Sequence, residues 1–213
     1  MTDFAVLLAG DIAATARLKA RLAGCRVIAA DAGIGHAEEL GVLPELWLGD
    51  FDSSKQPPRA GCEIEIAAYP ADKDKTDGEL AIEAAIARGA TRILLVGALG
   101  GPRSDHAFAH YILALRHAGA GIAIELDDGR ERCWPLTPGR TLDADLCAGT
   151  QFSILKFSDV TGLTITGARY PLDKVAVPFT SILTQSNEAT GPISVRIETG
   201  HAILMAQADP DRH

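Results

Sequence analysis

The sequence predicts a mixed α/β protein, with a parallel-sheet part followed by an all-β part. Short apolar runs alternate with stretches of helical spacing through the first half, as in consecutive βαβ units. Beyond residue 127 the helical spacing disappears, and short apolar segments are broken by Gly, Pro and Asn. The runs of the first half also end in carboxylates, glycines or a cation, which is typical of the ligand edge of an open α/β sheet.

The strands of the first half are expected where the chain is briefly apolar, because strands covered on both faces have this composition. They span residues 4–8, 26–30, 46–48, 62–67, 93–96 and 122–126. Together with the helices between them, they predict a Rossmann-like parallel sheet over residues 1–127.

Three helices are expected between these strands. The first covers residues 14–22. The second begins at Thr76, which has the capping-box spacing to Glu79, and it ends near Gly89. The third begins near Ser104 and ends at Gly119. Its apolar side chains on one face are Phe108, Ile112 and Leu115.

The second half is expected to form strands over residues 151–157, 163–165, 193–197 and 202–206. The change of period falls at Asp127-Asp128-Gly129. We therefore expect a second domain over residues 128–213.

Composition excludes some classes of function. A formal net charge of −8 over 213 residues argues against a nucleic-acid surface, which needs a basic stripe. The four cysteines lie far apart without a CxxC pair, which favours reduced thiols in the cytoplasm over a disulfide frame or a zinc site. The apolar run at residues 4–9 lacks a basic leader, so neither a signal peptide nor a membrane span is expected.

The most informative stretch is LWLGDFDSS at residues 46–54, where an apolar run ends in Asp50 and Asp52. Gly49 allows the chain to turn, and the two carboxylates then point into one small space. Like charges held close need a cation, and Mg²⁺ prefers carboxylate oxygens together with water and substrate phosphates. The alternative is a solvated turn, in which Asp and Ser are also common.

Similar residues follow the other strands of the first half. They are Asp31-Ala32-Gly33, the run from Asp72 to Asp77, and the run from Gly97 to His106. This set of residues suits transfer from a nucleoside triphosphate. It offers carboxylates for Mg²⁺, glycines that let amides approach phosphate, a helix amino terminus, and a Lys or Arg. The sequence has neither a Walker A motif nor GxGxxG, so a P-loop enzyme and a dinucleotide dehydrogenase are poorly supported.

At these positions the sequence resembles the thiamine pyrophosphokinase (thiamine diphosphokinase) family. The matching segments are DAG at 31–33, GDFDS at 49–53, KDKTD at 73–77, GGPRSDH at 100–106, TGL at 161–163 with GARYPL at 167–172, and SNE at 186–188. Each segment is weak alone, but their order and spacing are specific and cover nearly the whole chain. The resemblance departs at three residues, Ala32, the inserted Pro102 and His110, and Pro102 shifts Arg103 relative to the glycines.

The resemblance implies an amino-terminal α/β domain that binds nucleotide and metal, a carboxyl-terminal β-sandwich, and a homodimer in which thiamine lies between the two kinds of domain. It also implies the reaction: the hydroxyethyl oxygen of thiamine attacks the β-phosphorus of ATP, and AMP leaves. Such a transfer needs in-line geometry and charge neutralisation more than a strong base.

The resemblance also implies roles for single residues. The metal ligands are Asp50, Asp52 and Asp77, with Asp74 as the fourth. Lys73 and Arg103 would contact phosphate, and Gly100 and Gly101 would let the backbone come close to the nucleotide. Asp31 would lie on the substrate side of the site. Asp105 either orients the nucleophile or binds nucleotide. The thiamine contacts are Ser186 and Asn187 at the aminopyrimidine edge and the aromatic face of Tyr170.

Other interpretations stay open for several of these residues. Asp77 also suits the positive end of a helix, and Tyr170 also suits packing. Lys73 and Arg103 also suit a solvated surface. His106 and His110 lie one helical turn apart, but a zinc site needs a third ligand.

Two other functions compete with thiamine pyrophosphorylation. The first is a pyrophosphokinase with another acceptor, such as a hydroxymethyl-pterin, because the acceptor pocket is least fixed by the sequence. The second is a binding module that senses nucleotide or thiamine without turnover. The acidic set disfavours this module, since binding alone does not need four carboxylates around a metal.

Overall fold

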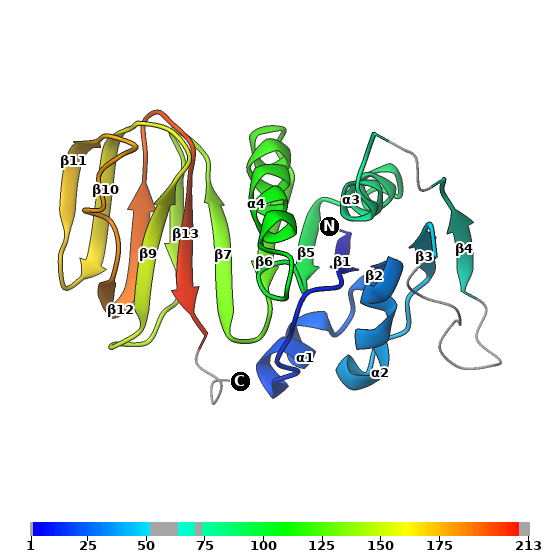
Figure 1. Cartoon of the computed structure of the whole chain (residues 1–213). Coiled ribbons are helices and arrows are strands. Elements are labelled where there is room, and N and C mark those ends of the chain that lie inside the picture. The colour runs from blue at the N-terminus through cyan, green and yellow to red at the C-terminus, as the bar shows by residue number, and fades with distance from the viewer. Residues whose placement is uncertain (1, 52–63, 71–73, 209–213) are drawn as a thin grey trace.

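The computed structural model describes residues 2–51, 64–70 and 74–208. The fold is a mixed α/β arrangement around a 13-stranded sheet, with the helices gathered on one half of it (Figure 1). The helices are α1 (Ala16–Leu22), the 3-10 helix η1 (Asp31–His36), α2 (Ala37–Leu40), α3 (Asp77–Ala87) and α4 (Ser104–Gly119). The strands of the first half are β1 (Asp3–Leu7), β2 (Arg26–Ala30), β3 (Leu46–Gly49), β4 (Glu65–Ala68), β5 (Arg92–Val96) and β6 (Ala123–Asp127). Those of the second half are β7 (Glu131–Leu136), β8 (Thr141–Ala144), β9 (Gln151–Lys156), β10 (Val160–Ala168), β11 (Leu172–Val177), β12 (Asn187–Arg196) and β13 (Ala202–Gln207).

The first half of the sheet is parallel, with the strand order β6-β5-β1-β2-β3-β4. The chain builds outward from β1 through β2, β3 and β4, and then returns to the other side of β1 with β5. The carboxyl ends of β1 and β5 therefore form the topological switch point at which open α/β sheets bind ligands.

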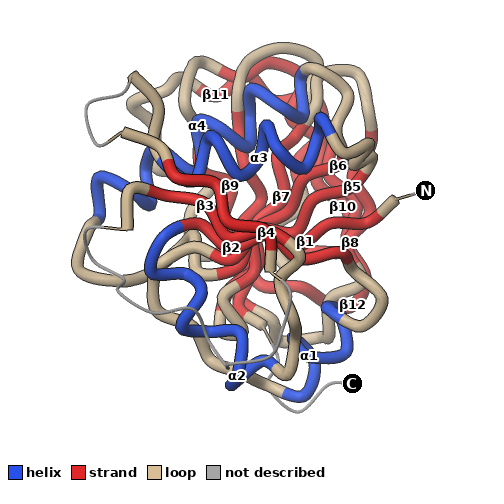
Figure 2. The backbone as a smooth tube through the Cα atoms, turned by 90° about the vertical axis from the view of Figure 1, so that its right-hand side faces the viewer, coloured by secondary structure: helices blue, strands red, loops and turns tan. Residues whose placement is uncertain are grey.

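Helices α3 and α4 cover one face of the parallel sheet, and α1 and α2 cover the other (Figure 2). Side chains alternate along each strand, so each strand contributes to both faces. Phe4 and Val6 pack with buried residues of α3 and α4. Ala5 and Leu7 pack with Leu18 and other buried residues of α1 and α2. The two cores fix the strand ends whose loops carry the carboxylates.

Two of the predicted helices begin where the sequence places them. Thr76 caps α3, and its Oγ1 accepts a hydrogen bond of 3.2 Å from the Glu79 amide. The predicted start of α4 at Ser104 is also confirmed. The apolar face read from its sequence is largely exposed, however, with Phe108 58% and Ile112 43% exposed.

The second half of the sheet is antiparallel and continues the first half without a break. The register pairs Leu126 of β6 with Cys133 of β7, so the expected boundary after residue 127 lies within one hydrogen-bonded hairpin. The first residues of β12 pair with β9, and its later residues pair with β8 and β10. A separate apolar core fills this half, with Trp134, Leu163 and Leu204 among its members.

A buried ionic cluster joins α1 to the β6–β7 hairpin. Asp127 is fully buried, and its carboxylate accepts hydrogen bonds from both terminal nitrogens of Arg17 and from one of Arg21. Arg21 also pairs with Glu125, and the guanidinium of Arg132 lies 4.4 Å from the ring centroid of Trp134. The cluster therefore ties the first helix to the strands where parallel pairing gives way to antiparallel pairing.

Across the described ranges, none of the helices combines the length and the apolar composition that a membrane crossing requires.

Candidate active site

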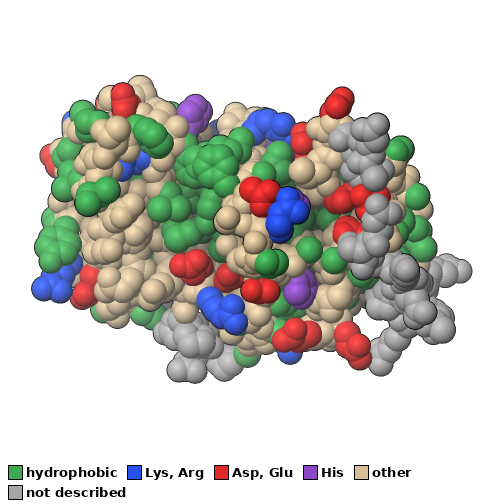
Figure 3. Space-filling view, viewed as in Figure 1, with side chains coloured by type: hydrophobic (Ala, Val, Ile, Leu, Met, Phe, Trp, Pro, Cys, Tyr) green, Lys and Arg blue, Asp and Glu red, His purple; other side chains and the backbone are tan. Residues whose placement is uncertain are grey.

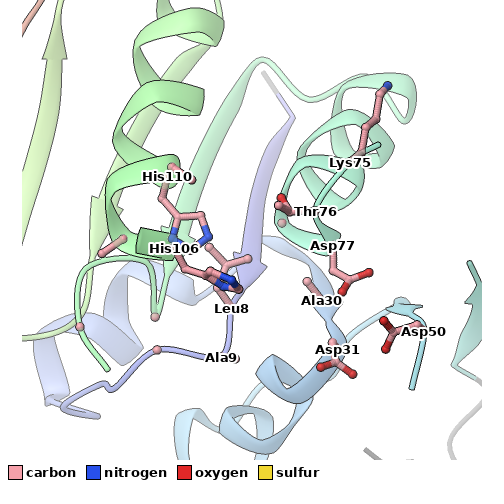
Figure 4. Close-up of a pocket in the computed structure, with 16 residues that line it drawn as sticks. Leu8, Ala9, Ala30, Asp31, Asp50, Lys75, Thr76, Asp77, His106 and His110 are labelled. Carbon is pink, nitrogen blue, oxygen red and sulfur yellow. The ribbon is translucent and has the colours of Figure 1, made fainter. Parts of the chain in front are cut away.

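A cavity of about 280 Å³ opens at the carboxyl edge of the parallel strands (Figure 4). Its walls come from the loops after β1, β2, β3 and β5 and from the first turns of α3 and α4. The lining residues include Leu8, Gly10, Asp31, Asp50, Thr76, Asp77, Gly97, Gly100, His106 and His110. The cavity thus occupies the switch point that the strand order predicts.

Three aspartates point toward one another across the cavity (Figure 4). Oxygen atoms of Asp31, Asp50 and Asp77 all lie within 4.8 Å of one another, and the three residues are half-buried. Three formal negative charges at this separation repel. The set of hard oxygen donors suits a divalent cation such as Mg²⁺, which uses few carboxylates and completes its coordination with water and phosphate.

Each aspartate is held by the end of a regular element. Asp31 follows β2 with φ of 41°, and its carbonyl accepts a 2.9 Å hydrogen bond from Trp47 Nε1. Asp50 follows Gly49, the last residue of β3. A Cβ atom on Gly49 would lie only 3.1 Å from the Cβ atom of Asp31, so the two loops pack closely. Asp77 is the first residue of α3 after the Thr76 cap. Neighbouring strands and one helix amino terminus therefore bring the carboxylates together.

The opposite wall requires glycine for steric reasons. A Cβ on Gly10 would lie 2.4 Å from the Gly100 carbonyl oxygen and 2.5 Å from that of Gly97. The Gly10 amide donates a 2.9 Å hydrogen bond to the Gly97 carbonyl. The loops after β1 and β5 pack main chain against main chain, so backbone groups form this side of the cavity.

The other predicted nucleotide-side residues have different positions where the structure describes them. Asp74 is exposed and lies outside the aspartate cluster, while Asp52 and Lys73 lie outside the described residues. Gly100 lines the cavity, and Gly101 packs behind it, where a Cβ would stand 3.2 Å from Gly10 Cα.

Arg103 and Asp105 pair with each other at the start of α4. Arg103 Nε and Nη2 donate to the two carboxylate oxygens of Asp105 at 3.0 and 2.8 Å. The hydrogen bonds from Arg103 hold the pKa of the Asp105 carboxyl well below its usual range. Both side chains are exposed, so the pair is accessible from solvent.

The two histidines of α4 differ in environment. His106 is exposed at the cavity wall, whereas His110 is buried and its Nδ1 donates a 3.0 Å hydrogen bond to the Ala98 carbonyl. Burial lowers the pKa of His110. Within the described ranges, neither histidine belongs to a group of three ligating side chains that could share an ion. His110 instead connects α4 to the loop after β5.

The predicted thiamine-side residues lie together in the antiparallel half. Tyr170 is 58% exposed, and Ser186 is exposed with φ of 58°. The sequence predicts that Asn187 contacts the aminopyrimidine. In the structure its side chain is buried and forms hydrogen bonds with the main chain of Tyr170. Tyr170 and Ser186 therefore present surface groups, and Asn187 lies beneath them.

Sequence reasoning missed part of the cavity. The sequence predicts Asp31 on the substrate side and not among the metal ligands, and the structure places its carboxylate in the cluster with Asp50 and Asp77. Sequence reasoning did not name Gly10 or Thr76 as lining residues. The available signal for Gly10 was its position at the end of the apolar run of residues 4–9, directly before Asp11.

Comparisons with known proteins agree over nearly the whole chain. The family "Thiamin pyrophosphokinase, catalytic domain" matches residues 22–126, and "Thiamin pyrophosphokinase, vitamin B1 binding domain" matches residues 141–204. Thiamine pyrophosphokinase of Bacillus subtilis is 32% identical over 166 residues, which cover 76% of this chain and 77% of the relative. The crystal structure of thiamine pyrophosphokinase from the same organism superposes with a TM-score of 0.82 at 25% identity, covering 98% of this chain and all of that one. That of thiamin pyrophosphokinase from Geobacillus thermodenitrificans gives 0.77 at 28% identity and covers 99% of both chains. The chain belongs to the thiamin pyrophosphokinase family.

Proposed function

We propose that this protein transfers the pyrophosphoryl group of ATP to thiamine and releases thiamine diphosphate and AMP. The observation that carries the proposal is the cluster of Asp31, Asp50 and Asp77 at the ligand edge of the sheet, in a chain that matches both domains of the family. The matched vitamin B1 binding domain favours thiamine over a hydroxymethyl-pterin as the acceptor. A binding module without turnover is disfavoured by the matched catalytic domain.

The residues of the cavity are proposed to hold Mg²⁺ and the triphosphate. Asp31, Asp50 and Asp77 would hold the ion, with Asp52 and Asp74 as further ligands predicted from the sequence. When bound, Mg²⁺ neutralises charge on the phosphate oxygens.

The walls of the cavity suit the phosphates of ATP. The backbone loops at Gly10 and Gly100 allow close approach of phosphate, and the amino terminus of α4 favours negative charge. Lys73 and Arg103 are proposed to contact phosphate, and Asp105 to bind nucleotide or orient the nucleophile. The exposed position of Arg103 allows it to exchange Asp105 for phosphate, because exposed ion pairs are weak.

The acceptor side is proposed to lie in the antiparallel half, as a β-sandwich. Tyr170 offers an exposed aromatic face to a flat cation, and Ser186 offers a hydroxyl. In the transfer, the thiamine hydroxyl oxygen forms a bond to the β-phosphorus and loses its proton, while the bond from the β-phosphorus to the AMP oxygen breaks.

We further propose a homodimer that brings these two sides together. Hydrophobic side chains gather beside α4 and over β7 and β13 (Figure 3). Phe108 and Ile112 are exposed there, and the ring centroids of Phe108 and Phe157 lie 6.0 Å apart. Exposed apolar surface of this kind marks an interaction site, and a second copy would cover it.

The free cysteines among the described residues, which include Cys25 and Cys133, fit a reducing compartment, so we propose a cytoplasmic location.

A product assay tests the proposed reaction. Incubation of the protein with ATP, Mg²⁺ and thiamine is expected to give thiamine diphosphate and AMP in equal amounts. ADP with thiamine monophosphate would overturn the proposed reaction type. Product with a hydroxymethyl-pterin and none with thiamine would overturn the proposed acceptor.

A further inference from the structure

We infer that Asn187 is a positioning residue, which fixes the main chain of Tyr170 so that the tyrosine ring and Ser186 face the acceptor. The inference rests on the proposed function for the identity of the acceptor. It assigns to Asn187 a role other than direct recognition of the aminopyrimidine edge.

The hydrogen bonds of Asn187 are directed into the protein. Its Nδ2 donates to the Tyr170 carbonyl at 2.8 Å, and its Oδ1 accepts from the Tyr170 amide at 3.1 Å and from the Glu188 amide at 2.8 Å. A side-chain amide has two N–H groups and two acceptor lone pairs, and three of these four are used. The residue is only 8% exposed. Asn187 therefore has one remaining N–H group that could donate a hydrogen bond to a ligand, and this group belongs to a buried side chain.

The hydrogen bonds between Asn187 and Tyr170 take the place of strand pairing, which the sheet does not provide at Tyr170. β10 ends at Ala168 and β11 begins at Leu172, so Tyr170 lies between strands. A buried polar group of the main chain without a partner is costly, and the amide of Asn187 satisfies both the N–H and the C=O of Tyr170. Asn187 thus acts as a short extension of β12 that pairs with the Tyr170 main chain.

Neighbouring contacts fix the same turn from both sides. The Arg169 amide donates to the Glu188 carbonyl at 2.8 Å, and the Arg169 guanidinium lies 5.6 Å from the Tyr170 ring centroid. The Ser186 amide donates to Ser153 Oγ at 3.0 Å, which places Ser186 in its left-handed conformation at the start of β12. The exposed ring is attached to backbone that Asn187 holds, and the exposed hydroxyl belongs to the residue directly before Asn187.

The test is a double-mutant cycle on thiamine binding, measured by titration calorimetry on the full chain. Asn187→Asp keeps the size of the side chain but places an oxygen against the Tyr170 carbonyl, and we expect the Kd for thiamine to rise about tenfold. Tyr170→Ala is expected to raise it by a similar factor. The two effects are expected not to multiply, because Asn187 acts through Tyr170.

Controls separate positioning from general damage. Gln185→Glu makes the same change of charge at an exposed side chain two positions away, and it is expected to leave the Kd for thiamine unchanged. The Kd for ATP is expected to stay the same in all variants. Factors that multiply in the double variant would overturn the inference, because they would indicate that Asn187 contacts thiamine independently of Tyr170. An unchanged Kd in Asn187→Asp would overturn it as well.

Hydrogen exchange gives a readout that does not need the acceptor. In the ligand-free protein, Asn187→Ala is expected to speed exchange at the Tyr170 amide while amides of β1 and β5 keep their rates. Unchanged exchange at Tyr170 would overturn the inference. A wild-type protein that fails to bind thiamine would overturn the proposed function instead, and the exchange result would still decide whether Asn187 holds Tyr170.

Discussion

Replacing Asp127 by Ala is expected to be the most destabilising single change in the ionic cluster that joins the two halves. Asp127 is fully buried and accepts two hydrogen bonds from Arg17, one from Arg21 and one of 2.9 Å from the Gly129 amide. Its loss would leave the buried guanidinium of Arg17 without its bidentate partner. Breaking a buried ion pair from one side costs about 3–5 kcal/mol.

The expected loss is large compared with the total stability of such a protein. A decrease of about 4 kcal/mol is a substantial share of the roughly 5–15 kcal/mol that stabilise a typical native protein. For a chain of this length it corresponds to a fall in Tm of about 8–16 °C. Urea unfolding followed by circular dichroism measures the free energy of unfolding directly.

A matched control distinguishes the fully buried carboxylate from a partly exposed one in the same cluster. Glu125 pairs with Arg21 in the same cluster, but its side chain is 27% exposed. Glu125→Gln is therefore expected to cost only about 0–1 kcal/mol. If Asp127→Ala lost no more stability than Glu125→Gln, the cluster would not join the two halves in the way that its geometry indicates.

The same cluster predicts how stability depends on pH. Burial raises the pKa of Asp127, but its hydrogen bonds with Arg17 and the charges of Arg17 and Arg21 outweigh burial and lower it overall. Because the folded pKa is depressed, this stabilisation is present above the unfolded pKa of about 3.9 and is lost as the pH falls through the folded pKa. Asp127→Asn is expected to remove that part of the acid dependence.

Three further predictions address the cavity and the proposed dimer. Asp50→Asn is expected to reduce turnover more than about 100-fold at an unchanged Tm, because one carboxylate of the cluster loses its charge. Turnover within a factor of two of wild type in the product assay would show that Asp50 has no role in the reaction. Gly10→Ala is expected to cost about 1–3 kcal/mol in unfolding free energy, because its Cβ meets the carbonyl oxygens of Gly97 and Gly100. Gly35→Ala, where a Cβ meets nothing within 4 Å, is the control, and equal losses in the two variants would contradict the steric argument. Phe108→Glu is expected to shift the proposed dimer toward monomer in sedimentation velocity, because it places a charge in the exposed apolar surface. An active monomer of the wild-type protein would refute the shared site.

The sequence predicts best those features that depend on neighbours in the chain. The cap of α3 was predictable because Thr76 and the Glu79 amide are three residues apart, so the bond needs no tertiary contact. The apolar stripe of α4 was also visible, but periodicity does not say what covers a face. Leu113 and Ala114 face the core, while Phe108 remains exposed.

The candidate site was predictable in part, for the same reason. Asp50 could be identified as a ligand candidate because it follows an apolar run at a glycine. The place of Asp31 in the cluster depends on β2 lying beside β3 in a register that pairs Ala30 with Leu48, which no local pattern encodes. Asn187 meets Tyr170 only after β10 and β12 pair, so its spacing did not reveal whether the amide faces a ligand or the main chain.

The strand order supports the proposal that two copies of the chain form one site together. Six strand-to-strand steps separate the start of β12 from β1, which is about 29 Å along the sheet at roughly 4.8 Å per step. Asp31 follows β2, one step farther away. The attacking oxygen must approach phosphorus to within about 3–3.5 Å, so an acceptor held at Tyr170 and Ser186 does not reach a phosphate held at Asp31 in the same copy. A second copy that covers the apolar surface beside α4 would remove this separation, because it would bring its own antiparallel half to the cavity. The order of the strands and the exposed apolar surface therefore support the proposed shared site independently of each other.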